Sequence, residues 1–232
     1  MVTMSGLVET MGSHPTARLG LDLGDEEDVG RWLIANSLLG GRIATQTSLR
    51  AFLSLREHGL ERPATLLQTG ASRVASVLRS VDFPRHEQAA RQVIRLAEGL
   101  SKAGGSLEAL ASNAVDLQEL GPRLTNLAPG FGVGGVTRFL RPLRETWAQA
   151  MELPLHPAAR AAAIHLGFIG ESEDLEGEPG AFRAAIRKEP DDLSFADLEW
   201  GLERLGGLSC ARDQPERCPL SGHCPHLLSP GS

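Results

Sequence analysis

Apolar residues recur at spacings of three and four through most of this chain, as in Val93, Leu96, Ala97 and Leu100. That period is typical of amphipathic helices, and glycine and proline separate one stretch from the next. Alternating β-branched residues are absent, so the sequence predicts an all-α protein of many short helices. The expected helices span residues 28–39, 43–55, 63–68, 72–81, 85–102, 106–112, 116–127, 136–151, 157–166, 181–187 and 195–205, the first capped by Asp28.

Two segments fall outside this pattern. Residues 1–24 have no helical period and are expected to be a loose N-terminal segment. Residues 171–180 are expected to form an acidic loop. The chain contains no apolar run of the roughly eighteen residues that a membrane span needs and does not begin with a signal-peptide pattern. We therefore expect a cytoplasmic, nucleoid-associated monomer with no membrane partner.

The charge is unevenly distributed. The 232 residues carry a net charge of −6, but residues 45–145 contain 13 basic and 9 acidic side chains, a net of +4, which leaves −10 for the remainder. Only two of the 23 basic residues are lysines, Lys102 and Lys188. Because local surface charge governs a phosphate contact, the central region remains suited to nucleic acid.

A glycine-rich turn interrupts the helical pattern in the second half of the chain. Residues 128–135 read Ala-Pro-Gly-Phe-Gly-Val-Gly-Gly, with helical stretches on both sides. This layout is that of a helix-hairpin-helix motif, here over residues 117–143. Such a hairpin presents unpaired backbone N–H groups and a helix N-terminus, and both favour a phosphate group. We expect Gly130, Gly132 and Gly134 to contact double-stranded DNA.

Together with the C-terminal cysteines Cys210, Cys218 and Cys224, these features resemble the endonuclease III superfamily of helix-hairpin-helix base-excision DNA glycosylases. The resemblance covers residues 28–225 and implies a two-lobed fold with DNA in the cleft between the lobes. One lobe would be a six-helix region over residues 45–145. The other would combine residues 25–44 with residues 146–232, including the Cys loop at 210–224. Proteins of this kind rotate a damaged base out of the duplex and fill its place.

The segment Ile43-Ala44-Thr45-Gln46-Thr47-Ser48 is similar to the family segment in which a glutamine enters the gap left by the flipped base. The resemblance therefore makes Gln46 the intercalating residue. The alternative is an ordinary polar residue at the start of a helix.

The chain departs from the family at both catalytic positions. The lyase members carry a lysine two residues after the second hairpin glycine, and that position is Gly134. The family aspartate is expected within residues 151–158, which contain no Asp. Glu152 and His156 are the candidate substitutes there. Glu152 would act as a base, and so would His156, whose reference pKa lies near neutrality. Otherwise His156 starts a helix before Pro157, and Glu152 is solvated.

The run Phe139-Leu140-Arg141-Pro142-Leu143-Arg144 resembles a divergent branch of the superfamily that tends to lack the usual catalytic pair. Arg138, Arg141 and Arg144 recur every three residues. Residues at that spacing share a helix face, so all three are expected to line the DNA surface. A solvated arginine face is the alternative.

Cys210, Cys218 and Cys224 are the only cysteines of the chain, and all lie near its C-terminus. The resemblance implies a 4Fe–4S cluster, but the family set has four cysteines and Pro215 stands where one is expected. Three thiolates would then need a fourth ligand from Asp213, His223, His226 or a small molecule. Zinc with a histidine is another alternative, and a loop that holds no metal is a third.

Three functions follow as hypotheses. The first is a protein that binds damaged or distorted duplex DNA without Schiff-base lyase chemistry. The second is a monofunctional DNA glycosylase of base-excision repair that uses a relocated base. The third is a metal or iron–sulfur interaction protein that does not act on DNA. The missing lysine and aspartate favour the first.

Overall fold

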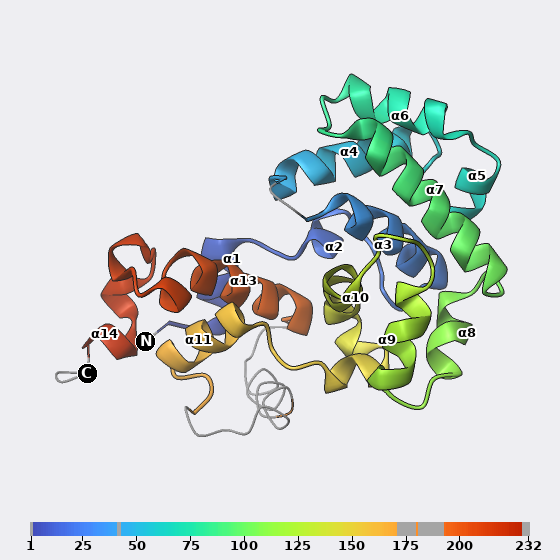
Figure 1. Cartoon of the computed structure of the whole chain (residues 1–232). Coiled ribbons are helices and arrows are strands. Elements are labelled where there is room, and N and C mark those ends of the chain that lie inside the picture. Colours follow the sequence, from blue (N-terminus) through green and yellow to red (C-terminus); the bar gives the residue numbers. More distant parts are fainter. Residues whose placement is uncertain (1, 41–42, 171–179, 181–192, 229–232) are drawn as a thin grey trace. The chain divides into compact units, whose positions relative to one another are not determined.

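The computed structural model describes residues 2–40, 43–170, 180 and 193–228. These residues form helices joined by short turns, and no β-strand occurs among them (Figure 1). The all-α prediction is confirmed. None of the described helices is long and apolar enough to cross a membrane. The acidic loop expected over 171–180 and the helix expected over 181–187 lie outside the described residues, except for Gly180.

The chain divides into two compact units. A central unit comprises Pro15–Ala150, and a terminal unit comprises Met1–His14 with Met151–Ser232. The helices of the central unit are α2 (Pro15–Arg18), α3 (Glu26–Leu38), α4 (Thr45–Glu57), α5 (Pro63–Leu67), α6 (Ala71–Ser80), α7 (His86–Lys102), α8 (Leu107–Ser112), α9 (Leu117–Thr125), α10 (Val133–Leu140) and the 3₁₀ helix η1 (Arg141–Glu145). A second 3₁₀ helix, η2 (Ala148–Glu152), reaches the boundary between the two units.

The described helices of the terminal unit are α1 (Met4–Met11), α11 (Pro157–His165), α13 (Phe195–Leu208), η3 (Cys210–Arg212), η4 (Pro215–Arg217), η5 (Ser221–His223) and α14 (Pro225–Leu228). In this unit α13 packs on α11 and α1. The backbones approach closely, since a Cβ at Gly206 would lie 1.8 Å from the Ala158 carbonyl oxygen. Glycine is therefore required at that crossing.

Side-chain caps start several helices where the sequence supplies Ser or Asp. Asp25 accepts a hydrogen bond from the Asp28 amide at 3.0 Å, and Asp116 accepts one from the Glu119 amide at 2.8 Å. A cap of this kind stabilises a helix by about 1 kcal/mol. The cap of α3 is thus Asp25 rather than Asp28, whose side chain instead pairs with Arg31.

The lobe boundary expected from the sequence is wrong for α3. Residues 25–44 were expected to join the C-terminal helices, but α3 belongs to the central unit and contacts α4, α5, α7, α8 and α10 (Figure 1). Its Trp32, Leu33 and Ile34 side chains are fully buried. A helix with this much apolar surface stays with the elements that cover it, because its burial is the main source of stability.

The N-terminal segment, expected to be loose, instead contains helices. Residues 1–24 include α1 and α2, and the first of these buries Met4, Leu7 and Met11 in the core of the terminal unit. The spacing of these three residues, three and then four, is helical. The side chain of Thr3 caps α1 by accepting from the Gly6 amide at 3.1 Å.

The helix expected over 136–151 is shorter and starts earlier. It begins at Val133 and ends at Leu140, and two 3₁₀ helices follow. Pro142 explains the end, because a proline in a helix interior has no N–H to donate and clashes with the preceding turn. The change of helix type alters which way the later side chains point.

Candidate nucleic-acid interface

The hairpin between α9 and α10 is a type II turn. The Phe131 amide donates to the Ala128 carbonyl at 3.0 Å, which closes a turn with Pro129 and Gly130 at its centre. Gly130 has φ +88°, the left-handed value that the third position of this turn requires. Proline presets the second position. The four residues therefore encode the turn locally.

Close packing fixes the hairpin on the rest of the central unit. A Cβ at Gly99, in the last turn of α7, would lie 1.7 Å from the Leu127 carbonyl oxygen, so only glycine allows this approach. The Phe131 ring is buried, and its atoms would lie 3.1 Å from a Cβ at Gly135. The backbone contact between Gly99 and Leu127 thus holds the base of the hairpin against α7, and the Phe131 ring fills the space beside Gly135.

The N-terminus of α10 presents backbone amides to solvent. Gly132 is the N-cap, in an extended conformation, and has no side chain to cap the helix. The N–H groups of Gly132, Val133 and Gly134 have no acceptor in the part of the chain that the structure describes. All three residues are exposed, Val133 by 76%. Adjacent unpaired amides at the positive end of a helix dipole attract an anion.

Side chains of α3 hold α10 from behind. The Trp32 Nε1 donates to the Phe139 carbonyl at 2.9 Å, and the Asn36 Nδ2 donates to the Gly135 carbonyl at 3.0 Å. Arg138 donates to the Leu39 carbonyl. These bonds leave the amide end of α10 free and anchor its other face.

The three arginines expected on the DNA surface do not share one exposed face. Arg144 is 1% exposed and donates to the Ala150 carbonyl at 3.0 Å, so its assignment to a DNA surface is wrong. Arg138 and Arg141 are half-buried. Although these arginines are three residues apart, their side chains do not form one surface, because α10 ends at Leu140, before Arg141 and Arg144.

Gln46 lies in the first turn of α4 and is exposed. Its Oε1 accepts from the Arg18 guanidinium at 2.5 Å. The side chain is thus accessible, as both the intercalating role and the ordinary helix-start role require.

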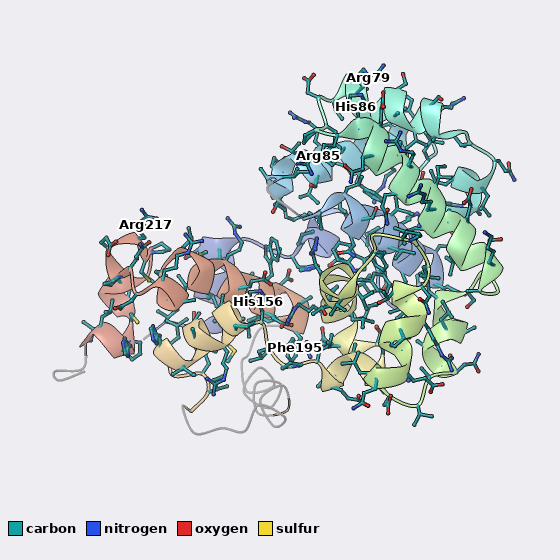
Figure 2. All side chains as sticks on the ribbon, viewed as in Figure 1. Arg79, Arg85, His86, His156, Phe195 and Arg217 are labelled. Carbon is teal, nitrogen blue, oxygen red and sulfur yellow. The ribbon has the colours of Figure 1, made fainter. Side chains whose placement is uncertain are left out.

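Glu152 and His156 belong to the terminal unit. Glu152 is exposed at the end of η2. His156 is the N-cap of α11, where its Nδ1 accepts from the Ala158 amide at 3.2 Å (Figure 2). Its Nε2 lies 3.7 Å from a Glu203 carboxylate oxygen. A histidine in this position starts a helix and has one ring nitrogen already engaged.

The three cysteines lie around one small cavity of about 30 Å³ in the terminal unit. Cys218 and Cys224 are buried in the core of the terminal unit. Burial raises the pKa of the Cys210 thiol. His165 and His226 stack beside them with ring centroids 4.0 Å apart. Among the described residues, no group of three or more His, Cys, Asp or Glu side chains is arranged to hold a metal ion.

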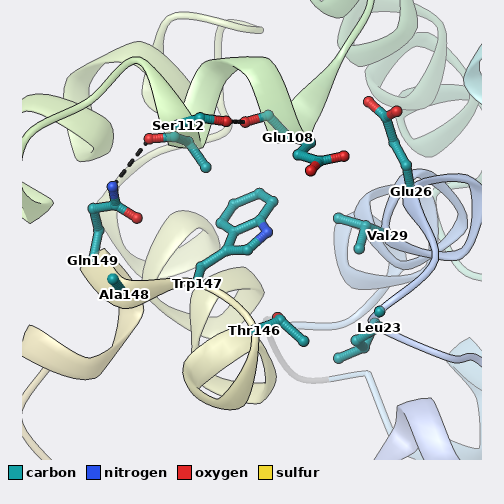
Figure 3. Close-up of a pocket in the computed structure, with 11 residues that line it drawn as sticks. Leu23, Glu26, Val29, Glu108, Ser112, Thr146, Trp147, Ala148 and Gln149 are labelled. Carbon is teal, nitrogen blue, oxygen red and sulfur yellow. Dashed lines mark hydrogen bonds between the residues drawn. The ribbon is translucent and has the colours of Figure 1, made fainter.

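A second hollow, of about 260 Å³, lies in the central unit between α3, α8 and η2. Trp147 forms its floor, with the Glu26 and Glu108 carboxylates at its rim (Figure 3). The Gln149 amide closes one side by donating to the Ala114 carbonyl at 2.7 Å. Two carboxylates disfavour a phosphate here, so this hollow is electrostatically unsuited to the DNA backbone.

No known protein-family description and no curated protein sequence matches this chain. Its own geometry therefore carries the functional argument.

Sequence reasoning missed the α7 residues that flank the hairpin. Gly99 was the available signal, because a glycine inside an amphipathic helix costs about 1 kcal/mol relative to alanine and often marks a close backbone contact.

Proposed function

We propose that this chain binds duplex DNA, damaged or distorted, through the helix-hairpin-helix motif, as a divergent member of the endonuclease III superfamily. The supporting observation is the row of three exposed amides, at Gly132, Val133 and Gly134, that begins α10 without an acceptor in the described chain. A DNA phosphate supplies the acceptor. Backbone amides read no base, so this contact positions the protein without selecting a sequence.

The same hairpin argues against Schiff-base chemistry of the usual kind. Gly134 has no side chain, and a Cβ there would meet no described atom within 4 Å. An amine nucleophile is therefore missing at the position where the family resemblance expects it. A monofunctional glycosylase remains the alternative, but the helix-capping role of His156 favours binding over catalysis.

Val133→Pro tests the proposal by removing one amide hydrogen and little else. Val133 is the first residue of α10, where proline is well tolerated. Gly132 before it has φ −80° and ψ −175°, which suits a residue preceding proline. Loss of one hydrogen bond to a charged phosphate should weaken binding by about 10- to 100-fold. Val133→Ala keeps the amide and is the matched control.

Fluorescence anisotropy with labelled intact, mismatched and abasic duplexes measures this effect. We expect binding that weakens steeply with salt, as phosphate contacts require, and a preference for distorted duplex that Gln46→Ala reduces. Salt-independent or absent binding contradicts the proposal. Borohydride with abasic DNA should trap no covalent complex, and a trapped adduct would show that a primary amine of this chain does act as a nucleophile.

A further inference from the structure

A groove of about 460 Å³ flanks the hairpin on the α7 side. Its walls come from α7 and from the end of α9 with the first hairpin residues, and its lining includes Arg95, Lys102 and Arg123 against the single carboxylate of Glu98. Arg123 is paired with Glu119. Arg95 and Lys102 are exposed and form no ion pair with the described residues. The groove is therefore cationic.

The groove is continuous with the hairpin. Pro129 lines the groove, and Gly130 follows it at the tip of the turn. The Gln92 side-chain oxygen of α7 lies 3.3 Å from the Cβ position of Gly130, and Gly99 contacts Leu127 at the hairpin base. The hairpin thus lies along α7 from Gln92 to Gly99.

We infer that this groove binds a second stretch of the phosphodiester backbone of the same DNA, beyond the phosphate at the α10 amides. The inference rests on the DNA binding proposed above and extends it from one contact to a track. Arg95 and Lys102 are seven residues apart on α7, about two helical turns, so they face the same way at a rise of about 10 Å. A DNA strand carries one phosphate per about 3.4 Å of helix axis, so two cations at this separation contact different phosphates of one strand.

Removing both cations while leaving the hairpin intact separates the two contacts. Arg95→Ala/Lys102→Ala removes two phosphate contacts. In the unsubstituted protein, each such contact accounts for about a 3.5-fold loss of affinity when the salt concentration rises from about 50 to about 200 mM. The loss of affinity over that salt range should therefore be about 12-fold smaller than in the unsubstituted protein. Arg73→Ala/Arg79→Ala removes the same charge from exposed positions on α6 and should keep the original salt response.

Phosphate ethylation interference gives the positional readout. The full chain should show two groups of sensitive phosphates, and Arg95→Ala/Lys102→Ala should retain only the group contacted by the hairpin. Glu98→Gln removes the one carboxylate lining the groove and should strengthen binding several-fold. Circular dichroism melting of each variant verifies that it is folded.

The outcomes distinguish this inference from the hairpin proposal. If Val133→Pro weakens binding while Arg95→Ala/Lys102→Ala behaves like the α6 control, the groove inference alone is overturned. If the groove variant weakens binding while Val133→Pro does not, the hairpin proposal alone fails. Absence of duplex binding by the unsubstituted chain overturns both. Equal competition by polyglutamate at matched charge would identify an acidic peptide as the occupant and also overturn the inference.

Discussion

Gly134→Glu should stabilise the fold and weaken DNA binding at the same time. Gly134 is the second residue of α10, is exposed, and leaves space for a side chain, because a Cβ there meets no described atom within 4 Å. No acidic residue occupies the first turn of this helix. The substitution therefore adds a carboxylate at the helix N-terminus, where its interaction with the helix dipole is favourable. The proposed phosphate would occupy the same place.

The two effects have opposite signs and separate causes. Replacing a helical glycine by a straight-chain residue gains about 0.5–1 kcal/mol, and an acid in the first turn adds about 0.3–1 kcal/mol. Against DNA, a carboxylate about 4 Å from a phosphate costs about 1 kcal/mol at the dielectric constant of water and about 4 kcal/mol at an effective value of 20. The second range corresponds to about 5- to 1000-fold weaker binding.

Gly134→Gln is the matched control, because it has the same size and helix propensity without the charge. Urea denaturation should show both variants more stable than the unsubstituted chain, with Glu above Gln. Anisotropy titration should show Glu binding the duplex far more weakly than Gln. Equal affinities for the Glu and Gln variants would refute the assignment of phosphate to this helix end, whatever the stability data show.

Three further predictions concern the terminal unit. Burial lowers the pKa of His14 from 6.5 to about 3. The unfolded chain therefore binds a proton first, and unfolding free energy should fall by about 1.4 kcal/mol per pH unit from about pH 6.5 down to about pH 3. His14→Gln should flatten this dependence in urea titrations at several pH values, and an unchanged slope would contradict it. Gly206→Ala should destabilise the unit by about 1–3 kcal/mol because its Cβ meets the Ala158 carbonyl oxygen, whereas Gly207→Ala, with open space, should stabilise it by about 0.5–1 kcal/mol; thermal melting of the pair checks both signs. Cys210 should react slowly with iodoacetamide at neutral pH and faster as pH rises, since its thiol pKa is raised. Inductively coupled plasma mass spectrometry should find less than one iron or zinc per chain. Stoichiometric iron would instead favour the cluster implied by the family resemblance.

Local patterns were sufficient to predict the helices and the hairpin. The helices α4 to α9 follow the apolar spacing that predicts them, because each buries one stripe of its own residues. The turn at Pro129 and Gly130 depends only on the conformations that these two residues favour. Such features need no information from distant parts of the chain.

Features that depend on tertiary packing were not predictable in this way. The direction of Arg144 depends on where α10 stops and on the Ala150 carbonyl that receives it. The groove requires α7 and the hairpin to meet, and the contact that joins them, Gly99 with Leu127, links residues far apart in the sequence. Arg95 and Lys102 alone look like ordinary solvated side chains, and only their place beside the hairpin makes them candidates.

The glycines of the hairpin have different structural reasons, and the difference bears on function. Gly130 needs its positive φ, and Gly135 needs to accommodate the Phe131 ring. Gly132 and Gly134 have neither need, since neither has a positive φ and a Cβ at either meets no described atom within 4 Å. A glycine within a helix costs about 1 kcal/mol relative to alanine, so the fold alone would be better served by alanine at Gly134. Under the proposed function, the close approach of a DNA phosphate to these amides would account for glycine at both positions, because a negative charge is favoured at a helix N-terminus.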